Sequence, residues 1–284
     1  MEVPCSADRI RRVNPEQLRE ILDNDTTGSF QLLDVRQPYE YEAGHIPGAK
    51  WIPLSELEYR HGELDREKKI ITYCRSGHRG MAASILLCGL GFGNLYNLDG
   101  GMLNWQHEVI TGIPEEHPEL VTGKEDVGAI LRLALTLEQG AFEFYTKAHE
   151  TTKDPQVSQA FQKLARMEER HRELLYEQYS LLPGLGEVPP IKQLQAESGY
   201  MEGGLKIIDE LEKLEKRAFM DDLEALEMAL ENEYRSYDFY KRAAELVSDR
   251  KARGLLYAFA GEERNHITTL LHRIEEPIGG HYET

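Results

Sequence analysis

Apolar residues between positions 125 and 284 recur at alternating steps of three and four, the spacing of a helix that buries one face. Four long helices are predicted here, at about residues 125–150, 155–182, 221–246 and 250–274. Short turns join the first two helices and the last two, and the long connection at 183–220 matches a crossover between the two pairs. The pattern therefore predicts an all-α four-helix bundle, with a short amphipathic helix at about 205–218 inside the crossover.

Residues 1–113 alternate short apolar runs with helical segments. Strands are predicted at about 30–35, 69–73 and 94–98, and helices at about 15–22 and 80–90. This order is typical of an α/β domain with a mostly parallel sheet. The polar stretch at 114–118, bounded by prolines, is typical of a linker. We therefore divide the chain into an α/β domain at 1–113, a linker at 114–124 and the bundle at 125–284.

Acidic and imidazole side chains stand at several core positions of the predicted bundle, where leucine would be expected. They recur in pairs separated by 95 positions, and two tyrosines share the same displacement. The pairs are Glu138 and Glu233, Tyr145 and Tyr240, Glu168 and Glu263, and His171 and His266. Burying an ionised carboxylate without a partner costs about several kcal/mol or more. The arrangement therefore makes sense only if cations lie among these groups.

The six acidic and imidazole residues form a recognisable ligand set. One Glu from each of two helices and a Glu-x-x-His from each of the other two is the set of di-iron and di-manganese carboxylate bundles. Oxygen and imidazole donors without thiolate favour iron or manganese over a structural zinc. Charged helices can carry a single Glu-x-x-His by chance, but a doubled set on four apolar stripes makes that alternative improbable. We predict two bound iron ions, for which manganese or zinc can substitute.

This half of the chain resembles the ferritin-like superfamily, and most closely the rubrerythrins. The resemblance implies a non-haem diiron centre that reduces hydrogen peroxide, in which some of the glutamates bridge both irons. It also implies that Tyr145 and Tyr240 donate hydrogen bonds to the ligand carboxylates. Rubrerythrins usually carry a further Glu three residues after the ligand of the third helix, and Ser236 stands there in this chain. The chain also lacks the C-x-x-C spacing of a rubredoxin-type iron site.

A cysteine stands where a predicted strand passes into a predicted helix. In this loop Cys74 is followed by Arg75, Ser76, Gly77, His78 and Arg79. Backbone N–H groups at a helix N-terminus face such a position, and the basic side chains add positive charge, so Cys74 is expected as a reactive thiolate. An ordinary buried thiol is the alternative, and it suits Cys88, on an apolar helix face, better than Cys74.

The N-terminal part resembles a rhodanese domain through four patches in the expected order. These are Leu33-Asp34-Val35-Arg36 with Glu40, the Gly-His-Ile-Pro-Gly-Ala run at 44–49, the loop at 74–79, and Gly-Gly-Met-Leu-Asn-Trp at 100–105. The resemblance implies that Cys74 accepts sulfur from thiosulfate or another sulfane-sulfur donor and passes it, as a persulfide, to cyanide or a thiol. It implies that the amides of residues 75–79 steady the sulfur, and that Asp34 and Arg36 order the site. Gly80 departs from the Ser or Thr that usually follows the loop arginine.

Composition restricts the partners and the compartment. A net charge of -17 and a pI near 5.1 argue against nucleic acid or an anionic membrane surface as a partner. No apolar run reaches the length of a membrane span, and residues 1–5 lack the layout of a secretory signal, so a cytoplasmic location is expected. Three cysteines cannot all pair, which leads us to expect reduced thiols.

Together these features predict a two-domain sulfurtransferase with a diiron site of redox, peroxide- or oxygen-related function. One alternative is a sulfurtransferase whose bundle only binds iron, senses oxidants or mediates dimerisation. A non-catalytic scaffold is another, but Cys74 in its loop and the inward Glu and His residues weigh against it. The expected partners are a small sulfur donor, a thiol or cyanide acceptor, an electron-donor protein and a second copy in a homodimer.

Overall fold

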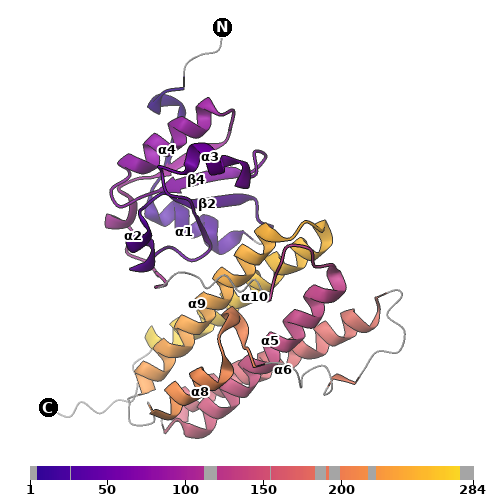
Figure 1. The fold of residues 1–284 in the computed structure, drawn as a ribbon. Coiled ribbons are helices and arrows are strands. Elements are labelled where there is room, and N and C mark those ends of the chain that lie inside the picture. The colour runs from indigo at the N-terminus through magenta and orange to yellow at the C-terminus, as the bar shows by residue number, and fades with distance from the viewer. Residues whose placement is uncertain are drawn as a thin grey trace, which may run out of the picture. The chain divides into compact units, whose positions relative to one another are not determined.

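The computed structural model describes seven segments of the chain, which are residues 5–25, 27–111, 120–153, 155–182, 190–191, 199–216 and 222–275. The chain divides into two compact units, Met1–Glu115 and Glu116–Thr284. Each unit is described by itself below (Figure 1). The division falls inside the linker predicted at 114–124, of which residues 114–119 lie outside the described segments.

The first unit contains a five-stranded sheet in the order β1-β5-β4-β2-β3. All four strand pairs are parallel, which confirms the predicted α/β architecture. The strands are β1 (Arg11–Val13), β2 (Phe30–Asp34), β3 (Ala49–Trp51), β4 (Lys69–Tyr73) and β5 (Leu95–Leu98). Because all strands run the same way, their carboxyl ends meet at one edge, where parallel sheets usually carry their sites.

Helices cover both faces of this sheet. They are α1 (Pro15–Asn24), α2 (Pro38–Glu42), α3 (Leu57–Arg60) and α4 (His78–Gly89), with 3₁₀ turns η1 (Ala7–Arg9), η2 (His61–Glu63) and η3 (Gly101–Leu103). Successive residues of a strand point to opposite faces. Leu33 accordingly joins the core under α4, while Leu32 joins the core under α1. Both cores are needed because β2 is buried along its whole length.

A disulfide joins Cys5 to Cys88, with 5.8 Å between their Cα atoms. The expectation of reduced thiols, including an ordinary thiol at Cys88, is therefore wrong for two of the three cysteines. The bond ties the segment before η1 to the last turn of α4, two places that are 83 residues apart in the chain. Only the folded sheet and its helices bring them together. Cys74 stays outside the bond.

The second unit is helical, as predicted. Its helices are α5 (Val127–Thr151), α6 (Pro155–Ser180), α8 (Ile207–Lys216), α9 (Asp222–Leu246) and α10 (Arg250–Glu275), with a 3₁₀ turn η5 (Glu202–Gly204). The long helix α5 packs along α6, and α9 packs along α10, while α10 also contacts α5 and α6. The Asp126 side chain caps α5 by accepting the Ala129 N–H, and Asp249 caps α10 in the same way through the Ala252 N–H. No described helix has the length and hydropathy that a membrane crossing requires.

Part of the predicted crossover at 183–220 is described. A short bridge pairs Tyr200 with Lys206, and the helix predicted at 205–218 corresponds to α8. The turn η5 packs on α9 and α5, and a Cβ on Gly140 of α5 would lie 2.6 Å from the Met201 Cα. Residues 183–189, 192–198 and 217–221 lie outside the described segments, including Asp221, where the third long helix was predicted to begin.

Candidate active site and candidate metal centre

The Cys74 loop lies at the carboxyl edge of the parallel sheet, between the end of β4 and the start of α4. Cys74 is buried, and its Sγ accepts a hydrogen bond from the Gly77 N–H at 3.2 Å. Gly77 caps α4 with φ of 88°, a left-handed conformation that glycine adopts without strain. The loop thus turns a backbone donor towards the sulfur.

The loop rests directly on η3. Its carbonyls at Cys74 and Arg75 accept the N–H groups of Met102 and Leu103, each at 2.9 Å. A Cβ on Gly101 would lie 2.2 Å from the Cys74 carbonyl oxygen, so this position tolerates only glycine. The second glycine of the Gly-Gly pair is therefore explained by the close approach of two backbones, and the first, Gly100, by its φ of 73° and by the Asn104 side chain.

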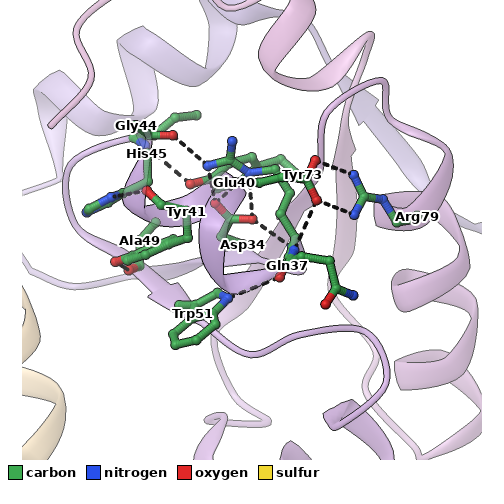
Figure 2. A network of polar contacts seen from close by, with 12 residues as sticks. Asp34, Gln37, Glu40, Tyr41, Gly44, His45, Ala49, Trp51, Tyr73 and Arg79 are labelled. Atoms are coloured by element: carbon green, nitrogen blue, oxygen red, sulfur yellow. Dashed lines mark hydrogen bonds and ion pairs between the residues drawn. The ribbon is translucent and has the colours of Figure 1, made fainter. Parts of the chain in front are cut away.

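Arg79 is paired with a carboxylate from α2. Its two terminal nitrogens donate to the two Glu40 oxygens at 2.6 and 2.7 Å, as Figure 2 shows. The hydrogen bond to Glu40 is the largest cause of the raised pKa of Arg79, and it also lowers the pKa of Glu40. The sequence predicted a positive Arg79 beside the thiol, but did not predict that Glu40 compensates this charge.

Three other loop positions face outward. Arg75, Ser76 and His78 are exposed, and the Ser76 Oγ lies 3.1 Å from the His78 Nδ1. The Gly77 N–H is the backbone donor to the sulfur, and Arg79 also interacts with the Cys74 side chain through a hydrogen bond and through its charge. The positive charge expected from Arg75 and His78 therefore lies at the rim of the loop.

Asp34 and Arg36 form a buried ion pair beside the site. The Arg36 Nη2 lies 2.6 Å from the Asp34 carboxylate and donates to the Gly44 carbonyl at 2.8 Å. Burial raises the pKa of Asp34, although the hydrogen bonds and charge of Arg36 oppose that rise. Figure 2 places Asp34 among Glu40, Tyr41, His45 and Tyr73. The pair links the end of β2 to the segment that follows α2.

The bundle brings all six predicted metal ligands together. Ligand atoms of Glu168, His171 and His266 lie within 4.8 Å of one another, as do those of Glu233, Glu263 and His266. The two imidazole rings stack with centroids 5.2 Å apart. The His266 Nδ1 lies 3.1 Å from Glu168 and 3.2 Å from Glu233.

His171 stands between the interior and the surface. Its Nδ1 lies 3.5 Å from the buried carboxylate of Glu138, while its Nε2 lies 3.7 Å from Glu262. Burial alone would lower the pKa of His171, but the hydrogen bond to Glu138 and the charges of Glu138, Glu262 and Glu233 give a net rise. Glu262 was not predicted, because it lies off the apolar stripe and half of its side chain is exposed.

Tyr145, one of the two predicted tyrosines, contacts a ligand carboxylate. The Tyr145 hydroxyl donates to Glu233, while Tyr240 is buried between Phe239 and Phe259. The Ser236 hydroxyl donates to the carbonyl of Asn232 in its own helix, at 3.1 Å. Rubrerythrins usually place a carboxylate at this position, whereas the Ser236 side chain forms its hydrogen bond within its own helix.

Buried charge indicates that this cluster fits a metal. Four carboxylates and two imidazoles leave negative charge in excess unless cations lie among them. The charge of His266 and its hydrogen bond keep the pKa of Glu233 low despite burial, which by itself raises it. Oxygen and imidazole donors suit iron or manganese. The six residues therefore fit the diiron centre that the sequence predicts.

Family comparisons agree with this division of the chain. A family model described as Rhodanese-like domain matches residues 14–108. A second model, described as Rubrerythrin, matches residues 129–273, which is more than half of the chain. The first family model contains the Cys74 loop, and the second contains all six ligand residues.

Several bacterial relatives resemble part of the chain. Uncharacterized protein YqhL of Bacillus subtilis is 44% identical over 75 residues, 26% of this chain and 60% of the relative. Putative sulfur carrier protein YrkF of the same organism is 37% identical over 100 residues, 35% of this chain and 53% of the relative. A protein named Sulfurtransferase from Allochromatium vinosum is 32% identical over 110 residues, 39% of this chain and 98% of the relative.

The chain thus matches less than two thirds of the first two relatives and nearly the whole of the third. It belongs to the rubrerythrin family through its helical unit and carries a rhodanese-like domain in its α/β unit.

Proposed function

We propose that the α/β unit is a sulfurtransferase that carries sulfur on Cys74. The observation that supports this most directly is the Gly77 N–H aimed at a buried Sγ at the carboxyl edge of the sheet. The similarity to a protein named Sulfurtransferase, nearly all of which aligns with this chain, supports the same reaction class.

The reaction has two steps. The Cys74 thiolate attacks the outer sulfur of thiosulfate; the sulfur–sulfur bond of thiosulfate breaks and sulfite leaves with the bonding electron pair. Cyanide, or a thiolate acceptor, then attacks the terminal sulfur of the Cys74 persulfide, and the thiolate is released. Backbone donors in the loop stabilise the negative charge on sulfur in both steps. Asp34 and Arg36 hold the neighbouring segment in place without contacting the sulfur donor.

Cys74→Ser tests this function. We expect it to abolish the formation of thiocyanate from thiosulfate and cyanide, because serine cannot form a persulfide. The matched control is the double variant Cys5→Ser/Cys88→Ser, which leaves Cys74 as the only cysteine and should keep the activity. Sulfur transfer that survives Cys74→Ser would refute the proposal.

We also propose that the helical unit holds two iron ions on Glu138, Glu168, His171, Glu233, Glu263 and His266. The convergence of these six side chains, all of them buried except the partly buried His171, supports the proposal. Bound iron would supply redox chemistry, since reduction of one hydrogen peroxide to two waters takes two electrons and two protons. Those electrons call for a reducing partner, which we propose to be an electron-donor protein. Tyr145 orients the Glu233 carboxylate through its hydrogen bond.

Metal analysis and peroxide consumption test the second site. We expect about two irons per chain, as in other bundles with this ligand set. Glu233→Ala should lower the iron content and peroxide consumption together. Glu227→Ala, on the exposed face of the same helix, should change neither. A well-folded protein that binds no iron would refute the ligand assignment.

Ser236 favours a second candidate function for the bundle, which is iron binding or oxidant sensing without turnover. Its hydroxyl is bonded to its own helix, and no carboxylate stands at that position. Two irons per chain with no peroxide consumption above that of Glu233→Ala would select this candidate.

Analytical ultracentrifugation of the full chain tests the proposed homodimer.

A further inference from the structure

Asn97 lies under the first turn of the helix that begins at the Cys74 loop. It belongs to β5, directly beside Thr72 of β4, and its side chain is buried. The Thr72 hydroxyl lies 3.3 Å from the Asn97 Oδ1 and 2.8 Å from the carbonyl oxygen of Gly80. The same hydroxyl lies 2.8 Å from the Ser84 Oγ. A buried polar network therefore joins two strands to α4, at the end where the loop enters the helix.

Gly80 is the position that this side chain requires to be empty. A Cβ on Gly80 would lie 2.2 Å from the Asn97 Oδ1, far inside van der Waals contact. The Gly80 backbone is helical and has no positive φ, so its conformation would accept any side chain. Glycine is therefore needed at residue 80 for space, most of which is taken by Asn97, while the Tyr73 Cα would lie 3.3 Å from the same Cβ.

The same amide reaches the residue that donates to the sulfur. A Cβ on Gly77 would lie 3.6 Å from the Asn97 Nδ2, so the side chain lies against both Gly77 and Gly80. The Gly77 N–H is the donor to the Cys74 Sγ. A change in the height of this turn above β5 would therefore move the donor relative to the sulfur.

We propose, on the basis of the sulfur transfer proposed above for Cys74, that Asn97 is the positioning residue of the cysteine loop. Its side chain fills from below the space that a side chain at residue 80 would fill from above. Gly80 and Asn97 form a size-complementary pair, and the pair holds the Gly77 N–H against the sulfur. Neither residue contacts the sulfur donor.

A swap of the two side chains tests the pair. The proteins are the wild type, Asn97→Ala, Gly80→Ser and the double variant Gly80→Ser/Asn97→Ala. Asn97→Ala leaves a void under the turn, and Gly80→Ser collides with the Asn97 amide, so each should lower kcat/KM for thiosulfate by about tenfold or more. The double variant should return to within about threefold of the wild type, because neighbouring sites couple. Asn94→Ala, on the exposed end of the same segment, is the matched control and should be unchanged.

A second readout separates this pair from the proposed function. Under non-reducing conditions Cys74 is the cysteine outside the disulfide, so its alkylation rate with iodoacetamide reports the loop without any sulfur donor. The alkylation rates should show the same losses and the same rescue. If the wild type transfers no sulfur, the function of Cys74 fails, while the alkylation rates still decide on Asn97.

Two results would overturn the role of Asn97. One is an Asn97→Ala or Gly80→Ser variant with wild-type rates in both assays. The other is a folded double variant no faster than the slower single variant. If Asn97→Ala does not fold, as judged by its denaturant unfolding curve, Asn97→Ser replaces it in the same comparison.

Discussion

Glu40 decides how the charge of Arg79 is used. The guanidinium gives both of its terminal nitrogens to this carboxylate, whose Oε2 also accepts the Gln37 N–H at 3.1 Å. Arg79 therefore connects the start of α4 to the start of α2. The sulfur of Cys74 faces the Gly77 N–H and also interacts with the guanidinium of Arg79, which Glu40 holds in place. We infer that the loop combines a fixed backbone dipole with a guanidinium whose position Glu40 fixes.

The pKa of Glu40 provides a test of this connection. Its hydrogen bond from Arg79 lowers the pKa below the ordinary value of 4.5. A carboxyl with a lowered folded-state pKa stabilises the fold above its unfolded-state pKa and loses that contribution as the pH falls through its folded value. We expect Glu40→Gln to lower the free energy of unfolding by about 1–2 kcal/mol at neutral pH.

The difference between Glu40→Gln and the wild type should shrink as the pH falls below 4.5. Denaturant unfolding of both proteins at neutral pH and below pH 4.5 measures this difference in the free energy of unfolding. Glu42→Gln, on the exposed side of the same helix, is the control and should cost little at either pH. A loss for Glu40→Gln that stays constant down to acid pH would contradict an ionic role.

Glu262 makes the two imidazoles of the bundle unequal. It lies 3.7 Å from the His171 Nε2. In the other half of the repeat, 95 positions earlier, the equivalent residue is Met167, which offers no carboxylate to His266. A carboxylate behind a ligand histidine fixes the ring and its tautomer, and its loss typically costs about 10–100-fold in metal affinity. We expect Glu262→Gln to weaken one of the two irons by about tenfold. Titration with a competing chelator should resolve the two steps.

The control for Glu262→Gln is Glu169→Gln, an exposed carboxylate on α6 next to a ligand residue. This control variant should release both irons to the chelator at the same concentrations as the wild type. Equal weakening of both irons by Glu262→Gln would show a general effect of surface charge, and would remove the link to His171.

At the scale of elements, the disulfide fixes the start of the chain to the last turn of α4. It closes a loop of 83 residues, and such cross-links typically stabilise by about 2–4 kcal/mol by restricting the unfolded chain. We expect reductant to lower the free energy of unfolding of the α/β unit by about this amount. The variant Cys5→Ser/Cys88→Ser should be insensitive to reductant. Thiol titration of the unreduced, denatured wild type should find only Cys74, and three reactive thiols would contradict the bond.

The elements differ in how far the sequence predicts them. Long helices such as α6 are predicted to within a few residues, because an apolar stripe over many turns has one clear period. The same stripes identify Glu168 and His171 as inward residues. The bond between Cys5 and Cys88 could not be predicted, since no local pattern reports a contact across 83 positions.

Side-chain pairings across elements were the other limit. Glu262 lies beside a ligand residue in the sequence but off its stripe, so periodicity assigns it to solvent. Asn97 looks like an ordinary strand residue until Gly80 is placed above it. The sequence shows that glycine replaces the usual Ser or Thr at residue 80. It does not show that Asn97 is the reason, because that contact depends on how α4 lies on β5.

At the scale of the whole molecule, each unit encloses its own chemistry. The α/β unit has separate apolar cores on the two faces of its sheet. The apolar cluster of the helical unit draws on α5, α6, α9 and α10, close to the ligand residues in the sequence of each helix. In the helical unit, the repeat at a displacement of 95 residues supplies matching ligands from each half. We therefore expect iron to stabilise the helical unit and to leave the α/β unit unaffected.

Iron removal tests that expectation in the full chain. A ligand that binds only the folded state stabilises it by about 2.7 kcal/mol at a hundred times its dissociation constant. Without iron, the buried carboxylates beside His171 and His266 repel one another, so the helical unit should unfold at lower denaturant concentration. Far-UV circular dichroism, which reports helix content, should follow this loss. The alkylation rate of Cys74 should not change, since its loop is held by η3, Glu40 and Asn97. A slower or faster rate after chelation would show that the two sites are coupled.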